Sequence, residues 1–174
     1  MPTSAREGRK FFTDRLDQIG LNVGSVVDFG PGEGTYSILG RHLTPFATWT
    51  AVEIYEPYVE RYDLDQKYDA IVIADMCSLV RAGGYSLGIF GDVLEHLTER
   101  DARKVLAAEA ARADWLFVSV PIVPAPQGPS HGNDAEAHLH DWTFEEMTDL
   151  LQTLGVVHAW RGHIIGRWWV QTTR

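Results

Sequence analysis

Residues 26–35 read VVDFGPGEGT, an apolar run that passes into three glycines at alternate positions and then into a helical pattern. Glycine permits positive φ and a close approach of the backbone to a ligand. The free N–H groups of a following helix attract an anion such as a carboxylate or phosphate. The dinucleotide fingerprint is G-x-G-x-x-G, whereas here Gly30, Gly32 and Gly34 alternate and Asp28 precedes them. The stretch therefore predicts a buried strand that ends in a ligand-binding turn of another kind.

Short apolar runs alternate with helical patterns along most of the chain. Continuous apolar runs separated by helices are typical of parallel strands that are buried on both faces. The last two runs, 156–160 and 164–172, are joined by a short polar turn and predict an antiparallel hairpin at the sheet edge. The other strands are expected at 25–29, 48–54, 68–74, 85–90 and 115–120, and the helices at 4–19, 35–43, 98–112 and from 143 onward. We therefore expect an α/β fold with a seven-stranded, mostly parallel sheet, helices on both faces and one antiparallel edge strand.

Length and composition are those of one globular domain. The 174 residues are 45% hydrophobic and 22% charged, which predicts a single domain over 1–174 that buries roughly 70% of its unfolded surface. The first residues lack an apolar signal core, and Cys77 has no cysteine partner, so a cytoplasmic location without membrane spans is expected. The net charge of -9 repels polyanions, and the basic residues are scattered. Nucleic acid is therefore not an expected partner.

The segment DFGPGEG resembles the first motif of the class I S-adenosylmethionine-dependent methyltransferases, which have a Rossmann-like fold. Acidic residues at the ends of later strands resemble that family too. The resemblance implies that Glu53 accepts from the ribose hydroxyls, that Asp75 accepts from the adenine amino group and that Met76 packs on the ring. The segment that begins at Asp92 resembles the family's fourth strand end. The implied S-adenosylmethionine-binding set is Asp28, Gly30, Pro31, Gly32, Gly34, Glu53, Ile54, Asp75, Met76, Asp92 and Val93.

Two loops are expected to face the transferred methyl group. They follow the fourth and fifth predicted strands and cover residues 92–98 and 121–142. The longer loop is the predicted substrate-side loop, since long loops in compact domains are often functional. Histidine suits proton removal from an acceptor because its ordinary pKa lies near working pH. We predict His140, His96 and Asp92 as the catalytic residues. The alternative for His140 is a structural role, in which Asp141 holds its ring and Trp142 packs the loop against the core.

The same loops raise the question of a metal ion. Asp92, Glu95 and His96, with His138 or His140, resemble the E-x-x-E-H plus distant histidine pattern of metal-dependent methyltransferases that modify the 3′-terminal ribose of small RNAs. Such ligands would suit Mg²⁺ or Mn²⁺. Here aspartate stands first, and Leu97 stands where a second adjacent histidine is expected. Because DVLEHL is also common in relatives that bind no metal, no metal is assigned from the sequence.

The resemblance implies an enzyme that transfers methyl groups from S-adenosylmethionine to a small or terminal acceptor. The acceptor would be a hydroxyl or amine of a sugar, a nucleotide-linked metabolite or a natural product. Acceptor contacts are expected from the lead helix in residues 1–20, from the 121–142 loop and, in a homodimer, from a second subunit. Three alternatives stay open at this point: a non-catalytic S-adenosylmethionine-binding partner subunit, a nicotinamide-dependent oxidoreductase and the metal-dependent RNA enzyme.

Overall fold

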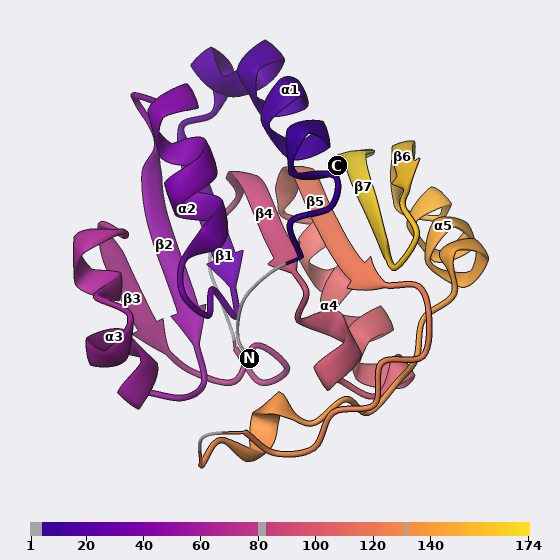
Figure 1. The fold of residues 1–174 in the computed structure, drawn as a ribbon. Helices are drawn as coiled ribbons and strands as arrows, with labels where there is room; N and C mark the ends of the chain where they lie inside the picture. The colour runs from indigo at the N-terminus through magenta and orange to yellow at the C-terminus, as the bar shows by residue number, and fades with distance from the viewer. Residues whose placement is uncertain (1–4, 80–82, 131) are drawn as a thin grey trace.

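A seven-stranded sheet forms the middle layer of the computed structural model, which describes residues 5–79, 83–130 and 132–174 (Figure 1). The strand order is β3-β2-β1-β4-β5-β7-β6. Strands β1 to β5 are parallel, while β7 runs antiparallel to both of its neighbours. The strands are β1 Ser25–Phe29, β2 Thr48–Glu53, β3 Ala70–Ile73, β4 Tyr85–Gly91, β5 Ala113–Pro121, β6 Gly155–Arg161 and β7 Ile165–Thr172.

The predicted α/β architecture is confirmed. The C-terminal hairpin forms one end of the sheet, with the antiparallel strand β7 one position inside the edge strand β6. The α-helices are α1 Arg9–Ile19, α2 Thr35–Gly40, α3 Pro57–Arg61, α4 Glu99–Ala110 and α5 Phe144–Gln152. Short 3-10 helices are η1 Gly20–Asn22, η2 Arg41–Leu43, η3 Leu64–Gln66, η4 Leu94–His96 and η5 Asp134–Glu136.

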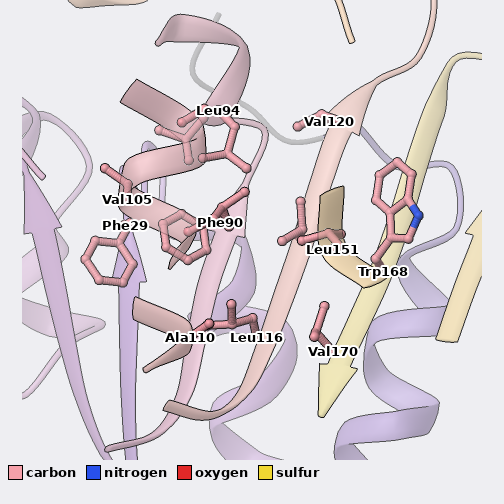
Figure 2. Packing of buried hydrophobic residues seen from close by; sticks show 14 of the residues in the cluster. Phe29, Phe90, Leu94, Val105, Ala110, Leu116, Val120, Leu151, Trp168 and Val170 are labelled. Atoms are coloured by element: carbon pink, nitrogen blue, oxygen red, sulfur yellow. The ribbon is translucent and has the colours of Figure 1, made fainter. Parts of the chain in front are cut away.

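Each face of the sheet has its own core. On one face, Phe12 and Leu16 of α1 and Tyr36 of α2 pack with the strands in a single buried cluster. On the other face, side chains from α4 and α5 cover β1, β4, β5 and β7, as Figure 2 shows for Val105, Leu151 and the stacked rings of Phe29 and Phe90. Alternate residues of a strand point to opposite faces, so one apolar run supplies both cores.

Side chains cap the helices that were expected at 98–112 and from 143 onward. The Thr98 hydroxyl accepts from the Asp101 N–H at the start of α4. Thr143 and Glu146 form a reciprocal capping box at the start of α5. These side chains satisfy backbone N–H groups that have no partner within the helix.

The lead helix begins later than the predicted residue 4, at Arg9. Gly8 precedes it with φ of 71°, and a Cβ atom there would lie 2.3 Å from the ring of Trp160. The left-handed backbone at Gly8, where the Trp160 ring leaves no room for a side chain, therefore ends the helical pattern. Residues 5–8 form a lead segment that contains a bend and a turn. The helix predicted from residue 4 is wrong over these residues, and residues 1–4 lie outside the described ranges.

The strand predicted at 68–74 is shorter and less buried than expected. β3 stands at the edge of the sheet, where it pairs with β2, and Val72 and Ile73 are 37% and 45% exposed. The described residues between β3 and β4, namely 74–79, 83 and 84, contain no helix. The expectation of burial on both faces is therefore wrong for this strand. Separately, none of the helices in the described ranges has the length and apolar character required to span a membrane.

Candidate functional site

A cavity of about 460 Å³ lies at the carboxyl ends of the parallel strands. It spans the point between β1 and β4 where the strand order reverses, which is the usual ligand site of open α/β sheets. Figure 1 shows the segment between β5 and α5, in orange, crossing below these strand ends. The lining includes Gly30, Pro31, Gly32, Glu53, Ile54, Asp75, Met76, Asp92, Val93, Glu95, His96, Glu136 and His138.

The glycine turn forms one wall of this cavity. Gly30 has φ of 62°, and a Cβ atom there would lie 2.4 Å from the Cγ2 atom of Val93. Gly34 has φ of 78° and stands immediately before α2. Backbone hydrogen bonds from Gly30 to the Val52 carbonyl and from Gly34 to the Pro31 carbonyl hold the turn in place. A ligand can therefore approach the backbone at Gly30, whereas Gly34 shapes the turn from outside the lining.

Asp28 stands behind the turn and does not line the cavity. Its carboxyl group is buried, and its Oδ2 atom accepts from the Tyr68 hydroxyl at 2.6 Å. Burial raises the pKa of Asp28 to about 7. The structure thus places Asp28 where it connects β1 to Tyr68, and not in contact with the cavity.

Glu53 does line the cavity at the end of β2. The residue is 3% exposed, and its Oε1 atom accepts from the Tyr55 N–H at 2.8 Å. Burial raises the pKa of Glu53 to about 7. Hydrogen-bond donors from a ligand would favour the ionised form of this carboxyl group.

The rim beyond Glu53 is apolar with one acidic group. Ile54 is 51% exposed, and Met76 lies close enough to the turn that its Cε atom is 3.9 Å from a Cβ atom placed on Gly30. Asp75 follows β3, and its Oδ1 atom accepts from the Cys77 N–H at 2.8 Å. The structure therefore brings together Ile54, Asp75 and Met76, as the resemblance implied.

Asp92 occupies the end of β4 in an unusual backbone conformation, with φ of 57°. A non-glycine residue in this region costs energy, and its neighbours must hold it there. The Ser119 carbonyl accepts from the Asp92 N–H, and the Ser119 hydroxyl donates to its Oδ1 atom at 2.5 Å. The N–H of Ala5 donates to its Oδ2 atom at 2.9 Å. The carboxylate of Asp92 thus joins β5, the lead segment and the cavity.

Arg167 holds the lead segment beside the cavity, a role that was not predicted from the sequence. It is completely buried on β7 and donates to the Tyr36 hydroxyl and to the carbonyl oxygens of Ala5 and Glu7, at 2.7, 2.7 and 2.9 Å. No ion pair to Arg167 occurs among the residues that the structure describes. Its place inside the apolar run IIGRWWV was the available signal, because arginine is rarely buried without a special partner.

The loop after β5 closes the other side of the cavity. His138 and Glu136 line it, and the Tyr58 hydroxyl donates to the Oε1 atom of Glu136 at 3.0 Å. The Gln127 side chain donates to the Glu136 carbonyl at 2.7 Å and so holds two parts of the loop together. These contacts were not predicted, since they depend on how the loop folds back on itself.

The predicted catalytic residues do not all meet. Asp92 and His96 line the cavity, but His140 does not. The His140 ring packs against Trp142 with ring centroids 4.4 Å apart, and its Nε2 atom is buried with no hydrogen-bond partner among the described residues. His138 lines the cavity in place of His140, and the backbone N–H groups of Leu139 and His140 both donate to the Glu95 carbonyl. His131, also in this loop, lies outside the described residues.

Glu95, His96 and His138 form a compact group at this end of the cavity. One possible ligand atom from each lies within 4.8 Å of the others. Burial and the neighbouring Asp92 hold the pKa of Glu95 well above its usual range, and burial lowers the pKa of His96.

The charge of the cavity is one-sided. Five acidic side chains line it, from Glu53, Asp75, Asp92, Glu95 and Glu136, while no lysine or arginine is found among its described lining residues. A positive ligand favours the ionised form of nearby carboxyl groups, including Glu53 and Glu95, so this lining suits a cation better than a polyanion.

Solved structures with the same fold include methyltransferases. The N-terminal domain of EvdMO1, solved with S-adenosylhomocysteine bound, has a TM-score of 0.70 and 12% identity over 97% of this chain and 82% of that one. The Burkholderia thailandensis 1,6-didemethyltoxoflavin-N1-methyltransferase has a TM-score of 0.66 and 19% identity over 97% and 83%. An O-methyltransferase family protein from the same organism has a TM-score of 0.65 and 14% identity over 94% of this chain.

This chain spans 55% of the length of that last protein. The sequence matches no protein-family model and no curated protein. At these identities the likeness concerns the fold, and the fold is the Rossmann-like fold of the class I S-adenosylmethionine-dependent methyltransferases.

Proposed function

We propose that the protein is an enzyme that transfers the methyl group of S-adenosylmethionine to a small acceptor. The observation that carries the proposal is the acidic cavity beside the Gly30 turn. S-adenosylmethionine bears a positive sulfonium, which suits a lining with five acidic side chains and, among the described residues, no lysine or arginine. Neighbours of the same fold bind S-adenosylhomocysteine, which supports the same cofactor here.

In this proposal the cofactor lies along the strand ends. Glu53 accepts from the ribose hydroxyls, and Asp75, Met76 and Ile54 surround the adenine. The turn at Gly30, Pro31 and Gly32 holds the methionine portion against Asp92 and Val93. Asp28 and Gly34 support the turn without touching the cofactor, since neither lines the cavity.

The acceptor would lie between η4 and the loop after β5. Methyl transfer is a direct displacement at a carbon that positive sulfur already activates. The protein therefore has to align the nucleophile, exclude water and, for an oxygen nucleophile, allow a proton to leave. Asp92 and His96 are the proposed catalytic residues, because both line this part of the cavity. His140 is proposed as a positioning residue, since its backbone N–H donates to the Glu95 carbonyl at 3.2 Å.

The lining also bears on the class of acceptor. Val123, Ala125 and Ile164 add apolar surface to a cavity whose described lining holds no lysine or arginine. This surface fits a small apolar ring or sugar that carries a hydroxyl or amine. The neighbour that binds 1,6-didemethyltoxoflavin acts on a molecule of this size class. A nucleic acid or a pyrophosphate-containing dinucleotide would meet five acidic groups and no lysine or arginine in the described part of the lining.

Calorimetry tests the cofactor assignment. S-adenosylhomocysteine should bind at one site per chain, while NAD should give no measurable heat of binding. Tight binding of NAD together with no binding of S-adenosylhomocysteine would overturn the proposal.

Methyl transfer is tested by measuring the release of S-adenosylhomocysteine with a panel of small hydroxyl and amine acceptors. Unchanged turnover in both Asp92→Ala and His96→Ala would show that the catalytic assignment is wrong.

A further inference from the structure

We infer that Glu95, His96 and His138 form a binding site for one divalent transition-metal ion at the acceptor end of the cavity. Their ligand atoms all lie within 4.8 Å of one another, and all three residues line the cavity. The residues come from η4 and from a loop some forty positions away, so the fold alone brings them together. The suggested role of the ion in acceptor binding rests on the proposed function, but its binding does not.

Glu95 has the properties of a ligand that lacks its ion. The residue is 3% exposed, and its Oε2 atom is buried without a hydrogen-bond partner among the described residues. A buried carboxyl oxygen without a partner is costly and calls for an explanation such as an ion. A metal ion bound between Glu95 and the two histidines would satisfy this group.

A backbone carbonyl faces one nitrogen of the His96 ring. Its Nδ1 atom lies 3.3 Å from the carbonyl oxygen of Ala137. Because a carbonyl can only accept, Nδ1 must carry the proton, which leaves the lone pair on Nε2. Histidines that bind metals are commonly held in this way by a backbone carbonyl, which fixes the tautomer and the ring.

The backbone holds the third ligand in position. The N–H groups of Leu139 and His140 both donate to the carbonyl oxygen of Glu95, at 2.8 and 3.2 Å. His138 is therefore attached, through its next two residues, to the residue that supplies the carboxylate. The rings of His96 and His138 lie 4.7 Å apart at 81°, so neither ring stacks flat over the other.

The donor set indicates the class of ion. Two imidazole nitrogens and one carboxylate suit Mn²⁺, Co²⁺ or Zn²⁺ better than Mg²⁺ or Ca²⁺, which favour oxygen ligands. Three protein ligands leave coordination positions open toward the cavity. An acceptor with a hydroxyl and a neighbouring oxygen could occupy them, and the ion would lower the pKa of that hydroxyl. The hydroxyl proton would leave to solvent, the oxygen lone pair would form the new C–O bond, and the electrons of the broken C–S bond would remain on sulfur.

Direct metal binding tests the inference without an activity assay. Tag-free protein stripped with EDTA is titrated with Zn²⁺ by calorimetry and with Co²⁺ by visible absorption. We expect one site per chain, with affinity weakened on the order of tenfold or more in Glu95→Gln and in His138→Ala. His158→Ala is the matched control, because His158 is an exposed histidine on β6 and its loss should leave both titrations unchanged.

Two results would overturn the inference: no metal binding by the wild-type protein, or the same affinity in both cluster variants and the control. His138 lies in a loop and is only partly buried, so His138→Ala keeps the test valid if Glu95→Gln fails to fold, as circular dichroism would reveal. S-adenosylhomocysteine titrations run on the same samples separate the two proposals. Metal binding without cofactor binding would remove the methyltransferase proposal and leave the metal site standing, and the reverse result would do the opposite.

Discussion

The backbone N–H of Ala5 donates to the Oδ2 atom of Asp92, 2.9 Å away, although the two residues stand 87 positions apart in the chain. The carbonyl oxygen of Ala5 in turn accepts a hydrogen bond from the side chain of Arg167. Glu7, two residues on, accepts from the backbone of His163 and Ile164 in the turn between β6 and β7. The lead segment is therefore attached to the cavity wall at several points, and Ala5 itself lines the cavity.

Replacement of Arg167 should loosen this segment. Arg167→Met leaves the carbonyl oxygens of Ala5 and Glu7 and the hydroxyl of Tyr36 without their donor. We expect the free energy of unfolding to fall by roughly 2 to 4 kcal/mol, because buried polar groups without partners are costly. Urea denaturation measures the change, and calorimetry should show weaker S-adenosylhomocysteine binding. In Arg103→Met, which removes an exposed i,i+4 pair on α4, stability should change by no more than about 0.5 kcal/mol. Equal stability of Arg167→Met and wild type would contradict the prediction.

Gly30 should not tolerate a side chain. In Gly30→Ala the new Cβ atom would lie 2.4 Å from Val93 at a positive φ, and the left-handed conformation alone costs about 1 to 2 kcal/mol. We expect a lower melting temperature and loss of measurable S-adenosylhomocysteine binding. Gly128→Ala provides the comparison, since nothing lies within 4 Å of a Cβ atom there and its φ is not positive. If the two variants bound equally well, the turn would not be the cofactor wall.

Glu53 should control cofactor affinity. Glu53→Gln removes a charged acceptor that the proposal assigns to the ribose hydroxyls, and a hydrogen bond to a charged group contributes about 1.5 to 3 kcal/mol. We therefore expect S-adenosylhomocysteine to bind on the order of 10 to 100 times more weakly. Glu56→Gln, an exposed neighbour, should bind like wild type. If both variants bound S-adenosylhomocysteine as tightly as wild type, the cofactor would not contact Glu53.

The same carboxyl group predicts a pH dependence of binding. Burial raises the pKa of Glu53 to about 7, and hydroxyl donors favour its ionised form. Binding should therefore release protons below neutral pH, and affinity should rise between pH 6 and pH 8. Calorimetry in buffers of different ionisation enthalpy measures the protons released. The rise should be absent in Glu53→Gln, and a wild-type affinity that falls over this range would exclude the mechanism.

Asp28 predicts how stability responds to pH. Its pKa is raised by burial from 3.8 to about 7, so the folded protein holds a proton that the unfolded chain has released. The stability of the protonated form is fully present below pH 4 and is lost as pH rises through about 7. Urea denaturation at pH 5 and pH 8.5 should show a smaller difference in Asp28→Asn than in wild type, by on the order of 2 kcal/mol. A change in the free energy of unfolding that the asparagine causes equally at both pH values cancels in this comparison. If the free energy of unfolding changed by the same amount between the two pH values in both proteins, Asp28 would not be neutral in the folded state.

Features encoded in adjacent residues could be predicted from the sequence. The Gly30 turn and the acidic residues Glu53, Asp75 and Asp92 all follow apolar runs, and parallel strands must end at the same edge of the sheet. The capping box of Thr143 and Glu146 lies within four residues and needs no tertiary partner. These parts of the fold and cavity therefore followed from local pattern and from the topology of parallel strands.

Features that depend on distant contacts could not be predicted. α1 begins late because Gly8 meets Trp160, a residue of the last hairpin. The partners of Arg167 lie more than 130 positions away in sequence. Whether His138 or His140 faces the cavity depends on backbone hydrogen bonds from the loop to Glu95. The local sequence pattern of the 121–142 loop therefore does not predict these contacts.

The acidic lining of the cavity has a consequence for turnover. Methyl transfer converts the charged sulfonium of the cofactor into the neutral thioether of S-adenosylhomocysteine. Walls that attract the incoming cation lose that attraction once the reaction is complete. In an enzyme built this way, the chemical step itself weakens the hold on the spent cofactor, and the same five side chains that favour loading also favour product release.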